Sequence, residues 1–413
     1  MKVFKFGGAA LKDAAGLINT AGIIRAHHQE PLLVVVSAMG NTTNALEEVV
    51  QLMLRNEPFS KPLDEITAYH RAIAETVLGR EHQVLEKISG LFGEIPSCYN
   101  GHDPDALYDQ VVSYGERVSS EIVGAYLTRL GLPCRLIDAR DYIITDTCYR
   151  EGKVIWPETE GRIRALASVL NHHVVLTQGF IGCAANGLTT TLGREGSDYT
   201  AAIFASCLQA QSVTIWKDVP GVMSADPRRI PNAVVFPELP YKEAAEMTYY
   251  GASVIHPKTI KPLALRNIPL YVKCFTNPGL PGTHIHDCHV ANLPPLIVFK
   301  ENQCLVSCKV VDYTFINEDQ LSIIFQALSE LDIKINVMQN SAISFSFCID
   351  FRESKVMPLV EKLRHTFEVY YNTDLVLITV KNYDAPTFEH YRKLPGVLLE
   401  QSSRSTLQVL IRK

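Results

Sequence analysis

The first 40 residues alternate between strand-like and helix-like patterns, and this order constrains the fold more than any other feature of the chain. Apolar runs at residues 3–6 and 32–37 predict two short strands. Between them, after a Gly7-Gly8 turn, residues 13–28 place apolar side chains on one helical face. Two strands joined through a helix form a βαβ unit, whose strands run parallel. We therefore expect an α/β protein with an open sheet sandwiched by helices.

The same alternation returns in the middle of the chain. Residues 174–176 and 213–216 are short apolar runs typical of strands, and residues 199–210 between them have a helical pattern. Residues 47–120 are helical in period and poor in strand signals, so we expect them to cover the sheet. One α/β domain is therefore predicted for residues 1–290.

A proline-containing boundary at residues 292–295 separates this domain from a tail of different character. Residues 296–372 follow a βαββαβ order, with strands at 305–311, 333–338, 343–350 and 367–371 and helices at 319–331 and 355–365. This order is typical of a ferredoxin-like unit, a small sheet with two helices on one face. Residues 373–413 predict a second, truncated copy, which ends before a second helix and a fourth strand and has strands at 375–380, 396–400 and 406–411.

Composition excludes several classes of protein. Of the 413 residues, 47% are hydrophobic and 20% are charged, as in folded globular proteins. The net charge of −5 offers no basic surface for nucleic acid, and no apolar run approaches the roughly 20 residues of a membrane helix. The N-terminus does not resemble a signal peptide, and the ten cysteines contain no CxxC pair. We therefore expect a cytoplasmic protein without structural disulfides and without nucleic-acid or membrane partners.

The first of three polar, glycine-containing clusters lies at the end of the first predicted strand. Ligands of open α/β sheets bind at the carboxyl ends of the strands. Gly7 and Gly8 leave backbone N–H groups unshielded at a helix start, and Lys5 adds a compact positive charge, a combination suited to phosphate. An ordinary strand-to-helix turn has the same pattern. The chain contains neither a P-loop motif nor a GxGxxG fingerprint.

Two further clusters follow predicted strands, at residues 178–198 and 216–228. In the first of these, Arg194 can hold a carboxylate in a bidentate manner, and Asp198 can orient a cation near a transferring phosphate. Helix N-capping would explain only Ser197 or Asp198. The other cluster is rich in turn residues and carries cations that can contact a nucleotide, although a surface β-turn would have the same composition.

Seven motifs, in order, resemble those of the aspartate kinases within the amino acid kinase family: KFGG, VVSAMGNTTNAL, SYGERVSS, TQGFIG, TTTLGREGSDY, WKDVPGVMSADPR and GASVIHP. The resemblance covers about residues 1–290, and the tail resembles the paired ACT regulatory domains of the same enzymes. It implies transfer of the γ-phosphoryl group of ATP to the side-chain carboxylate of L-aspartate. The product would be 4-phospho-L-aspartate, a precursor of lysine, threonine and methionine.

The resemblance also implies roles for individual residues. Lys5 would stabilise charge on the transferred phosphoryl group, Asp198 would orient Lys5, and the backbone of Gly7 and Gly8 would donate hydrogen bonds to phosphate. Glu116 would receive the ammonium group of L-aspartate and Arg194 its α-carboxylate, in a pocket that also includes Ser37, Thr43, Phe180 and Ser197. The ATP loop would include Lys217, Asp218, Met223 and Arg228. Mg²⁺ would be held mainly by ATP oxygens and water rather than by a protein cage.

The chain departs from the family pattern at several positions. Ala9 and Ala10 stand where hydroxyl residues are usual, and Glu195 replaces a usual glycine beside the anionic site. Ser253 stands where the family has a lysine that reaches the ATP phosphates, whereas Lys217 occupies a usual threonine position. Our hypothesis is that Lys217 supplies the charge that is missing at Ser253.

ACT domains of this family bind an amino acid between two copies, so lysine or threonine would be the expected effector. Two features argue against an effector here: residues 315–319 lack the glycine that lets the backbone of an effector approach, and the second copy is short. The exposed sheets of these units are still suited to pairing two chains in a homodimer. We expect no downstream dehydrogenase domain, because the chain ends at Lys413 within the second ACT copy.

Two other functions remain open. Another amino acid kinase, acting on glutamate, acetylglutamate or carbamate, would share the KFGG-like and nucleotide-loop features, but it would not need SYGERVSS, GREGSDY or an ACT tail. A non-catalytic amino-acid sensor would explain the departures from the family pattern. It would not explain why four charged residues of the site are retained, namely Lys5, Glu116, Arg194 and Asp198.

One group of residues consists of metal ligands by type: His284, His286, Cys288 and His289. It follows Pro281-Gly282-Thr283, at a position that matches a strand end without metal in the family. We therefore expect an exposed loop there, and no metal held by the protein.

Overall fold

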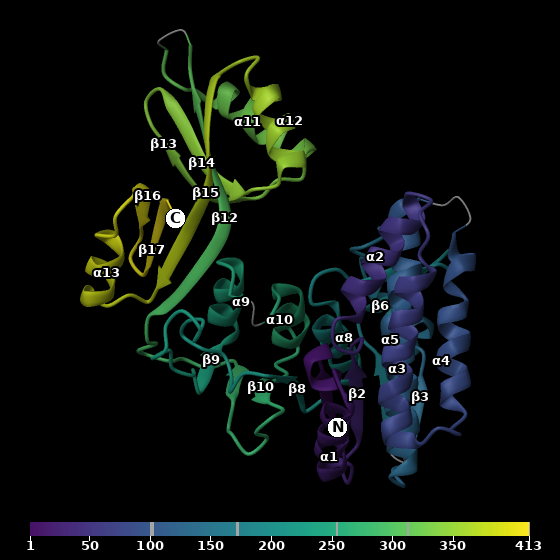
Figure 1. Cartoon of the computed structure of the whole chain (residues 1–413). Helices are drawn as coiled ribbons and strands as arrows, with labels where there is room; N and C mark the ends of the chain where they lie inside the picture. Colours follow the sequence, from purple (N-terminus) through teal and green to yellow (C-terminus); the bar gives the residue numbers. More distant parts are fainter. Residues whose placement is uncertain (100–102, 171–172, 253–254, 312–313, 413) are drawn as a thin grey trace. The chain divides into compact units, whose positions relative to one another are not determined.

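The computed structural model describes residues 1–99, 103–170, 173–252, 255–311 and 314–412. It divides into two compact units (Figure 1). The first unit contains residues 1–222, 235–245 and 253–290, and the second contains residues 223–234, 246–252 and 291–413. The chain passes between the units several times, so neither unit is one continuous segment.

The first unit is built on an eight-stranded sheet. In spatial order its strands are β3 (Cys134–Ile137), β5 (Val174–Gln178), β2 (Leu32–Val36), β1 (Lys2–Phe6), β8 (Ser212–Lys217), β10 (Leu270–Cys274), β11 (Thr283–His286) and β9 (Glu238–Pro240). The strands from β3 to β10 are parallel, as the βαβ pattern predicts. β11 runs antiparallel to β10, and β9 at the edge is parallel to β11. A small separate sheet consists of β4 (Ile144–Thr145), β6 (Ile181–Ala184) and β7 (Thr189–Thr191).

Helices cover both faces of the large sheet. Phe4 and Phe6 of β1 share one apolar core with α1 (Ala14–His27), α2 (Thr42–Leu54), α3 (Ser60–Leu78), α4 (Val84–Gly93) and α5 (Pro104–Arg129). On the other face, α8 (Gly196–Leu208) packs against β1, β2 and β8, and α8 in turn contacts α6 (Trp156–Arg164) and α10 (Pro257–Ala264). The remaining helical segments are α7 (Ala167–Leu170), α9 (Tyr241–Tyr249) and the 3₁₀ turns η1 (Gly8–Leu11), η2 (Ile95–Cys98) and η3 (Ala139–Asp141).

Most of the predicted elements of this unit are confirmed. The four predicted strands are β1, β2, β5 and β8, and the helical stretch at residues 47–120 contains α2 to α5. The expectation of an exposed loop is wrong for His284 and His286, because residues 283–286 form β11, whereas Cys288 and His289 follow the strand in a loop. Pairing with β10 on one side and β9 on the other buries Thr283 and Ile285, which the short sequence pattern did not reveal.

The second unit contains a six-stranded antiparallel sheet. In spatial order the strands are β13 (Ile335–Asn340), β14 (Ser344–Asp350), β12 (Leu296–Lys309), β15 (Glu368–Lys381), β17 (Thr406–Arg412) and β16 (Val397–Ser402). The helices α11 (Glu318–Glu330) and α12 (Glu353–Leu363) lie together and form a core with β12 and β14 (Figure 1). A third helix, α13 (Ala385–Arg392), packs Tyr391 against the core of β15 and β17. The predicted ferredoxin-like order is therefore confirmed.

The second half of this sheet is more complete than the sequence predicted. Residues 374–412 contain one helix, α13, and no second helix follows within these described residues, as expected. The fourth strand, however, comes from β12: its residues Leu296 to Lys300 pair antiparallel with Leu377 to Lys381 of β15. β12 and β15 are each 14 residues long and take part in both halves of the sheet. The second copy is therefore less truncated than predicted. The sequence analysis missed its fourth strand because residues 296–300 precede the first ferredoxin-like copy in the chain.

Among the described residues, no helix combines the length and the apolar character needed to cross a bilayer.

Candidate active site

A cluster of two lysines and one aspartate lies at the carboxyl ends of β1 and β8. Side chains of β1 alternate between the two faces of the sheet, so Lys5 points toward α8 while its neighbours enter the opposite core. There Lys5 Nζ lies 2.6 Å from Asp198 Oδ1. Lys217 Nζ, at the end of β8, lies 3.6 Å from the other oxygen, Asp198 Oδ2. The structure thus brings together Lys5, Asp198 and Lys217.

This cluster places two cations around one buried carboxylate. Asp198 and Lys5 are buried, with 1% and 8% of their surfaces exposed. Burial alone would raise the pKa of the Asp198 carboxyl, but the Lys5 and Lys217 ammonium groups lower it below its usual range. Two cations therefore share one ionised carboxylate. Such a pair of ammonium groups is suited to contact an anionic ligand.

A second buried carboxylate belongs to Glu116 of α5. Its Oε1 accepts a hydrogen bond from the backbone N–H of Ala38 at 3.3 Å, whereas Oε2 is buried without a hydrogen-bond partner in the described part of the chain. Burial raises the pKa of Glu116 to about 8, against the lowering effects of the Ala38 amide and of the nearby Lys5. A buried carboxylate with one open oxygen is suited to receive a cation such as an ammonium group.

The backbone of Gly7 and Gly8 lies beside the Lys5 ammonium group. A Cβ atom at residue 7 would be 3.3 Å from Lys5 Nζ. A Cβ atom at residue 8 would be 2.8 Å from the carbonyl oxygens of Ala38 and Gly40, so a side chain larger than that of glycine does not fit there. The Gly40 N–H donates a hydrogen bond to the Gly8 carbonyl at 3.0 Å. The loops after β1 and β2 are therefore packed backbone to backbone.

Helix α8 begins without a side-chain cap. Its N-cap residue is Glu195, in the left-handed conformation with φ of 54°, and Ser197 and Asp198 lie inside the first turn. The N-capping interpretation of Ser197 or Asp198 is therefore wrong, because the helix starts earlier than that pattern requires. Left-handed backbone favours glycine, which gives a physical reason for the glycine that is usual at this position.

Two glycines, Gly179 and Gly196, allow the segments that carry Phe180 and Ser197 to pack closely together. A Cβ atom at Gly179 would be 2.5 Å from Ser197 Cβ, and one at Gly196 would be 2.7 Å from Phe180 Cδ2. In addition, the Phe180 N–H donates a hydrogen bond to Thr200 Oγ1 at 3.0 Å. The loop after β5 is therefore packed on the first turn of α8, which also carries Asp198.

Four other candidate residues of the first unit lie at loop and helix starts. Ser37 follows β2 and is half-buried, and its carbonyl accepts a hydrogen bond from Ser119 Oγ of α5 at 2.7 Å. Thr43 is half-buried in the first turn of α2. Arg194 and Asp218 have exposed side chains, and no ion pair to Arg194 is found within the described residues. The Arg194 guanidinium is thus available to a ligand.

The remaining nucleotide-loop candidates belong to the second unit. Met223 is half-buried. Arg228 Nη2 lies 2.9 Å from Asp226 Oδ2. Hydrogen bonds from the side chain and the backbone of Arg228 lower the pKa of the Asp226 carboxyl. The position of Ser253 lies outside the described residues.

Sequence reasoning missed two residues that shape the site. The Ala38 amide fixes Glu116, but a backbone N–H group leaves no mark in the sequence. Asp109 of α5 is buried and accepts hydrogen bonds from Thr191 N and Oγ1, at 2.8 and 2.7 Å, and from Arg150 N at 2.9 Å. Burial raises the pKa of Asp109 to about 6. Asp109 therefore holds the strand that leads into the Arg194 turn, a role that became visible only in the fold.

A model of the amino acid kinase family matches residues 1–274. The chain belongs to this family. Within it, the relatives are aspartokinases: lysine-sensitive aspartokinase 3 of Escherichia coli K12 is 33% identical over 362 residues, which are 84% of this chain and 78% of the relative. The resemblance to the aspartate kinases is therefore confirmed.

Other relatives are longer, and solved structures agree with the fold. Bifunctional aspartokinase/homoserine dehydrogenase 2, chloroplastic, of Arabidopsis thaliana is 30% identical over 381 residues, 88% of this chain but 42% of the relative. This chain thus spans about two-fifths of that bifunctional protein. The crystal structure of E. coli aspartokinase III in complex with aspartate and ADP matches with a TM-score of 0.86 at 26% identity, over 100% of this chain and 96% of that chain.

Proposed function

We propose that this chain phosphorylates the side-chain carboxylate of L-aspartate with ATP. The observation that carries the proposal is the cluster of Lys5 and Lys217 around the buried Asp198, near the open carboxylate of Glu116. ATP and L-aspartate are both anionic at the reacting atoms, so their reaction requires concentrated positive charge. The ammonium group of L-aspartate requires a negative charge, and its approach would lower the pKa of Glu116 and favour the carboxylate that pairs with it.

In this proposal L-aspartate is bound at both of its ends. Glu116 pairs with the ammonium group, and Arg194 holds the α-carboxylate with its guanidinium. The pocket is completed by Ser37, Thr43, Phe180 and Ser197. Binding of the ammonium group would also complete the hydrogen bonding of Glu116 Oε2, which is buried and lacks a protein partner among the described residues.

Phosphoryl transfer would proceed without a covalent enzyme intermediate. A side-chain oxygen of L-aspartate attacks the γ-phosphorus, the bond to the bridging oxygen breaks, and ADP leaves with that oxygen. Lys5 stabilises the charge on the transferred group, with backbone N–H groups of Gly7 and Gly8 beside it, and Asp198 fixes Lys5 in position. When bound, Mg²⁺ would neutralise ATP oxygens, and it would be held mainly by those oxygens and by water. The Asp198 carboxylate pairs with both lysines.

The nucleotide would be held by the loop after β8. As the resemblance to the aspartate kinases implies, we assign Lys217, Asp218, Met223 and Arg228 to it. The ion pair of Lys217 with Asp198 supports the hypothesis that Lys217 supplies the charge missing at Ser253.

The activity can be tested by trapping the acyl phosphate with hydroxylamine. The full chain with ATP, Mg²⁺ and L-aspartate should form the hydroxamate, and glutamate, acetylglutamate and carbamate should give none. Lys5→Ala should abolish turnover while the circular dichroism spectrum stays unchanged. Absence of product with every substrate would favour the non-catalytic sensor instead, and product with another substrate would assign a different amino acid kinase.

The exchange of charge between positions 253 and 217 has its own test. Lys217→Ala should raise the KM for ATP and lower kcat by about tenfold or more, the cost of removing one charge-assisted contact. Lys217→Arg is the matched control and should retain most activity. Unchanged kinetics in Lys217→Ala, while Lys5→Ala is inactive, would refute the exchange.

Regulation and assembly rest on the second unit. We propose a homodimer formed through its sheets, and no feedback by lysine or threonine. The N-terminus of α11 is closed by a capping box in which Asn317 and Gln320 bond each other's backbone N–H groups at 3.0 Å, so these groups are engaged. Light scattering should give a dimer mass. Isothermal titration with lysine, threonine and methionine should show no binding, and sub-millimolar binding of any of them would contradict this part.

A further inference from the structure

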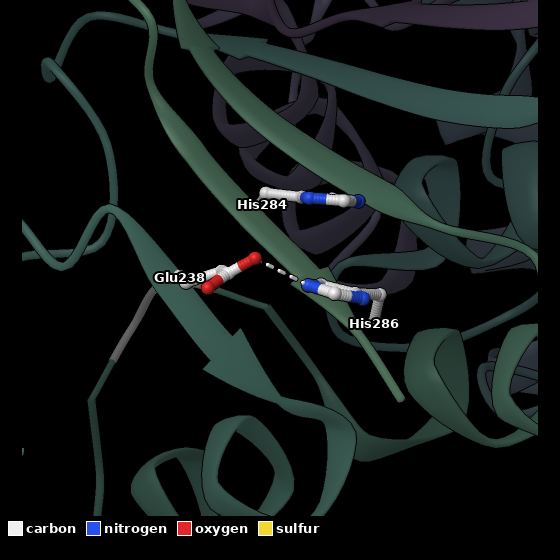
Figure 2. A group of neighbouring side chains, drawn as sticks. All are labelled: Glu238, His284 and His286. Carbon is white, nitrogen blue, oxygen red and sulfur yellow. Dashed lines mark hydrogen bonds and ion pairs between the residues drawn. The ribbon is translucent and has the colours of Figure 1, made fainter. Parts of the chain in front are cut away.

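Three side chains with metal-ligating atoms meet at the edge of the large sheet. His284 and His286 belong to β11, and Glu238 belongs to β9 (Figure 2). One ligand atom from each of the three lies within 4.8 Å of the others. His286 Nε2 is 2.8 Å from Glu238 Oε1. This group lies apart in sequence and in strand position from Lys5 on β1.

Strand geometry explains why these side chains share one face. Residues two apart on a strand point to the same side, so His284 and His286 lie together while Thr283 and Ile285 are buried on the other side. In the parallel register of β9 and β11, His284 is paired with Glu238. The arrangement is therefore built by the sheet itself and does not depend on a loop.

The two imidazole rings are oriented by aromatic stacking. The ring of His284 lies between those of Tyr271 and His286, with centroid distances of 4.5 and 3.9 Å and nearly parallel planes. His284 Nε2 is buried and has no hydrogen-bond partner among the described residues. A buried polar nitrogen of this kind costs free energy unless a ligand satisfies it.

We propose that Glu238, His284 and His286 bind one divalent cation of the late first transition series, with Zn²⁺ the best match. Two imidazole nitrogens and one carboxylate oxygen are a ligand set that Zn²⁺ accepts, with water in the fourth position. Ligands of a tetrahedral ion at about 2.1 Å from it are about 3.4 Å apart. Metal binding therefore requires side-chain rotations that bring the three ligand atoms closer together and direct one nitrogen of each stacked ring toward the ion.

The ion would link the edge strand β9 to its neighbour β11. β9 is three residues long and pairs with β11 at the end of the strand order. Its segment, residues 235–245, lies in the chain between two segments of the second unit, 223–234 and 246–252. A bond from Glu238 through the ion to β11 would hold this segment in the first unit. The role is structural and does not require turnover.

The test is a titration of the full chain, freed of metal with a chelator and desalted, with ZnCl₂ in a calorimeter. The wild type should bind one ion per chain and gain thermal stability. His284→Ala, His286→Ala and Glu238→Gln should each weaken binding by about tenfold or more. Glu238→Gln keeps a hydrogen-bond acceptor for His286, so a folded variant is available even if a histidine variant unfolds.

Two matched controls separate this site from other ligands of the chain. His289→Ala changes an exposed histidine nearby, and Cys288→Ser removes the neighbouring thiol; both should bind Zn²⁺ as the wild type does. The proposal is overturned if the wild type shows no saturable binding, if Glu238→Gln and both histidine variants bind as tightly as the wild type, or if Cys288→Ser alone abolishes binding.

Discussion

Charged and polar side chains are arranged differently in the two units. In the first unit, Asp198 is shared by Lys5 and Lys217. Beside this cluster, Glu116 keeps one buried oxygen without a hydrogen-bond partner among the described residues. The hydrogen bonding of Glu116 is therefore incomplete among the described residues.

In the second unit, the corresponding polar groups satisfy one another. Asp350 Oδ1 accepts hydrogen bonds from Gln303 Nε2 and Asn336 Nδ2, both at 2.9 Å, and pairs with Lys300 Nζ at 2.8 Å. Asn336 also donates a hydrogen bond to Gln303 Oε1 at 2.7 Å. This network closes around the register shift between Lys300 and Gln303 of β12.

The difference shows how a site can be told from a structural network. A satisfied network stabilises the fold, because each donor and acceptor that leaves water regains a hydrogen bond within the protein. An unsatisfied group costs free energy, and it persists where a ligand supplies the missing partner. By this criterion, substitutions at Asp198 or Glu116 should change activity, and those in the Asp350 network should change stability alone.

The largest effect is expected for Asp198→Asn. Without the carboxylate, Lys5 and Lys217 repel each other and Lys5 loses its position, so kcat should fall by about 10²–10³-fold. The hydroxamate assay measures this. Asp350→Asn, which neutralises the carboxylate of the second unit, is the control and should keep its kcat. Equal losses in both variants would remove the distinction between the units.

Glu116→Gln should raise the KM for L-aspartate by about tenfold or more and leave that for ATP nearly unchanged.

The effect of the same substitution on the free energy of unfolding should depend on pH. Because the folded pKa of Glu116 is raised to about 8 from 4.5, the native state holds this proton more tightly than the unfolded state, and the wild type loses stability as pH rises between these values. Glu116→Gln has no proton to lose at this position. Its free energy of unfolding, measured with denaturant, should therefore rise relative to that of the wild type from pH 5 to 8, by at most about 5 kcal/mol. A constant difference would contradict the buried state of Glu116.

Asp350→Ala should destabilise the second unit by about 1–2 kcal/mol, since three partly exposed hydrogen bonds are lost, while kcat is unchanged. Three partners, Lys300, Gln303 and Asn336, lower the pKa of Asp350 although burial acts in the opposite direction. Its contribution is therefore present above the unfolded pKa and disappears as pH falls through the folded value. Urea unfolding at neutral pH and below pH 4 would measure it. A difference that grows in acid would refute the network.

The smallest effect is expected for Glu195→Gly. Glycine adopts the left-handed backbone of residue 195 without strain, but it also increases the entropy of the unfolded chain, so stability should change by less than about 1 kcal/mol. Removing a carboxylate beside an anionic site should lower the KM for the anionic substrates slightly. A kinetic comparison with Glu195→Gln separates charge from backbone, because glutamine removes the charge alone. A large loss of activity in both variants would give Glu195 a role of its own.

Local patterns were sufficient for much of this molecule. Alternating strand and helix signals predicted β1, β2, β5 and β8, because each element is specified by its own periodicity. Residues of the charged site were found by their motifs. The loop expected at His284 and His286 is wrong, since a short strand depends on neighbours that are distant in the chain.

The sequence by itself determined the parallel sheet, the ferredoxin-like tail and the identity of the charged residues near Lys5. Only the tertiary structure decided that Lys217 shares Asp198, that the Ala38 amide fixes Glu116, and that β12 supplies a strand to both halves of the second sheet. It also placed Glu238 beside His284. The physical reason is the same in each case. Periodicity acts over a few residues, whereas burial, charge pairing and strand register join atoms that lie far apart in the sequence.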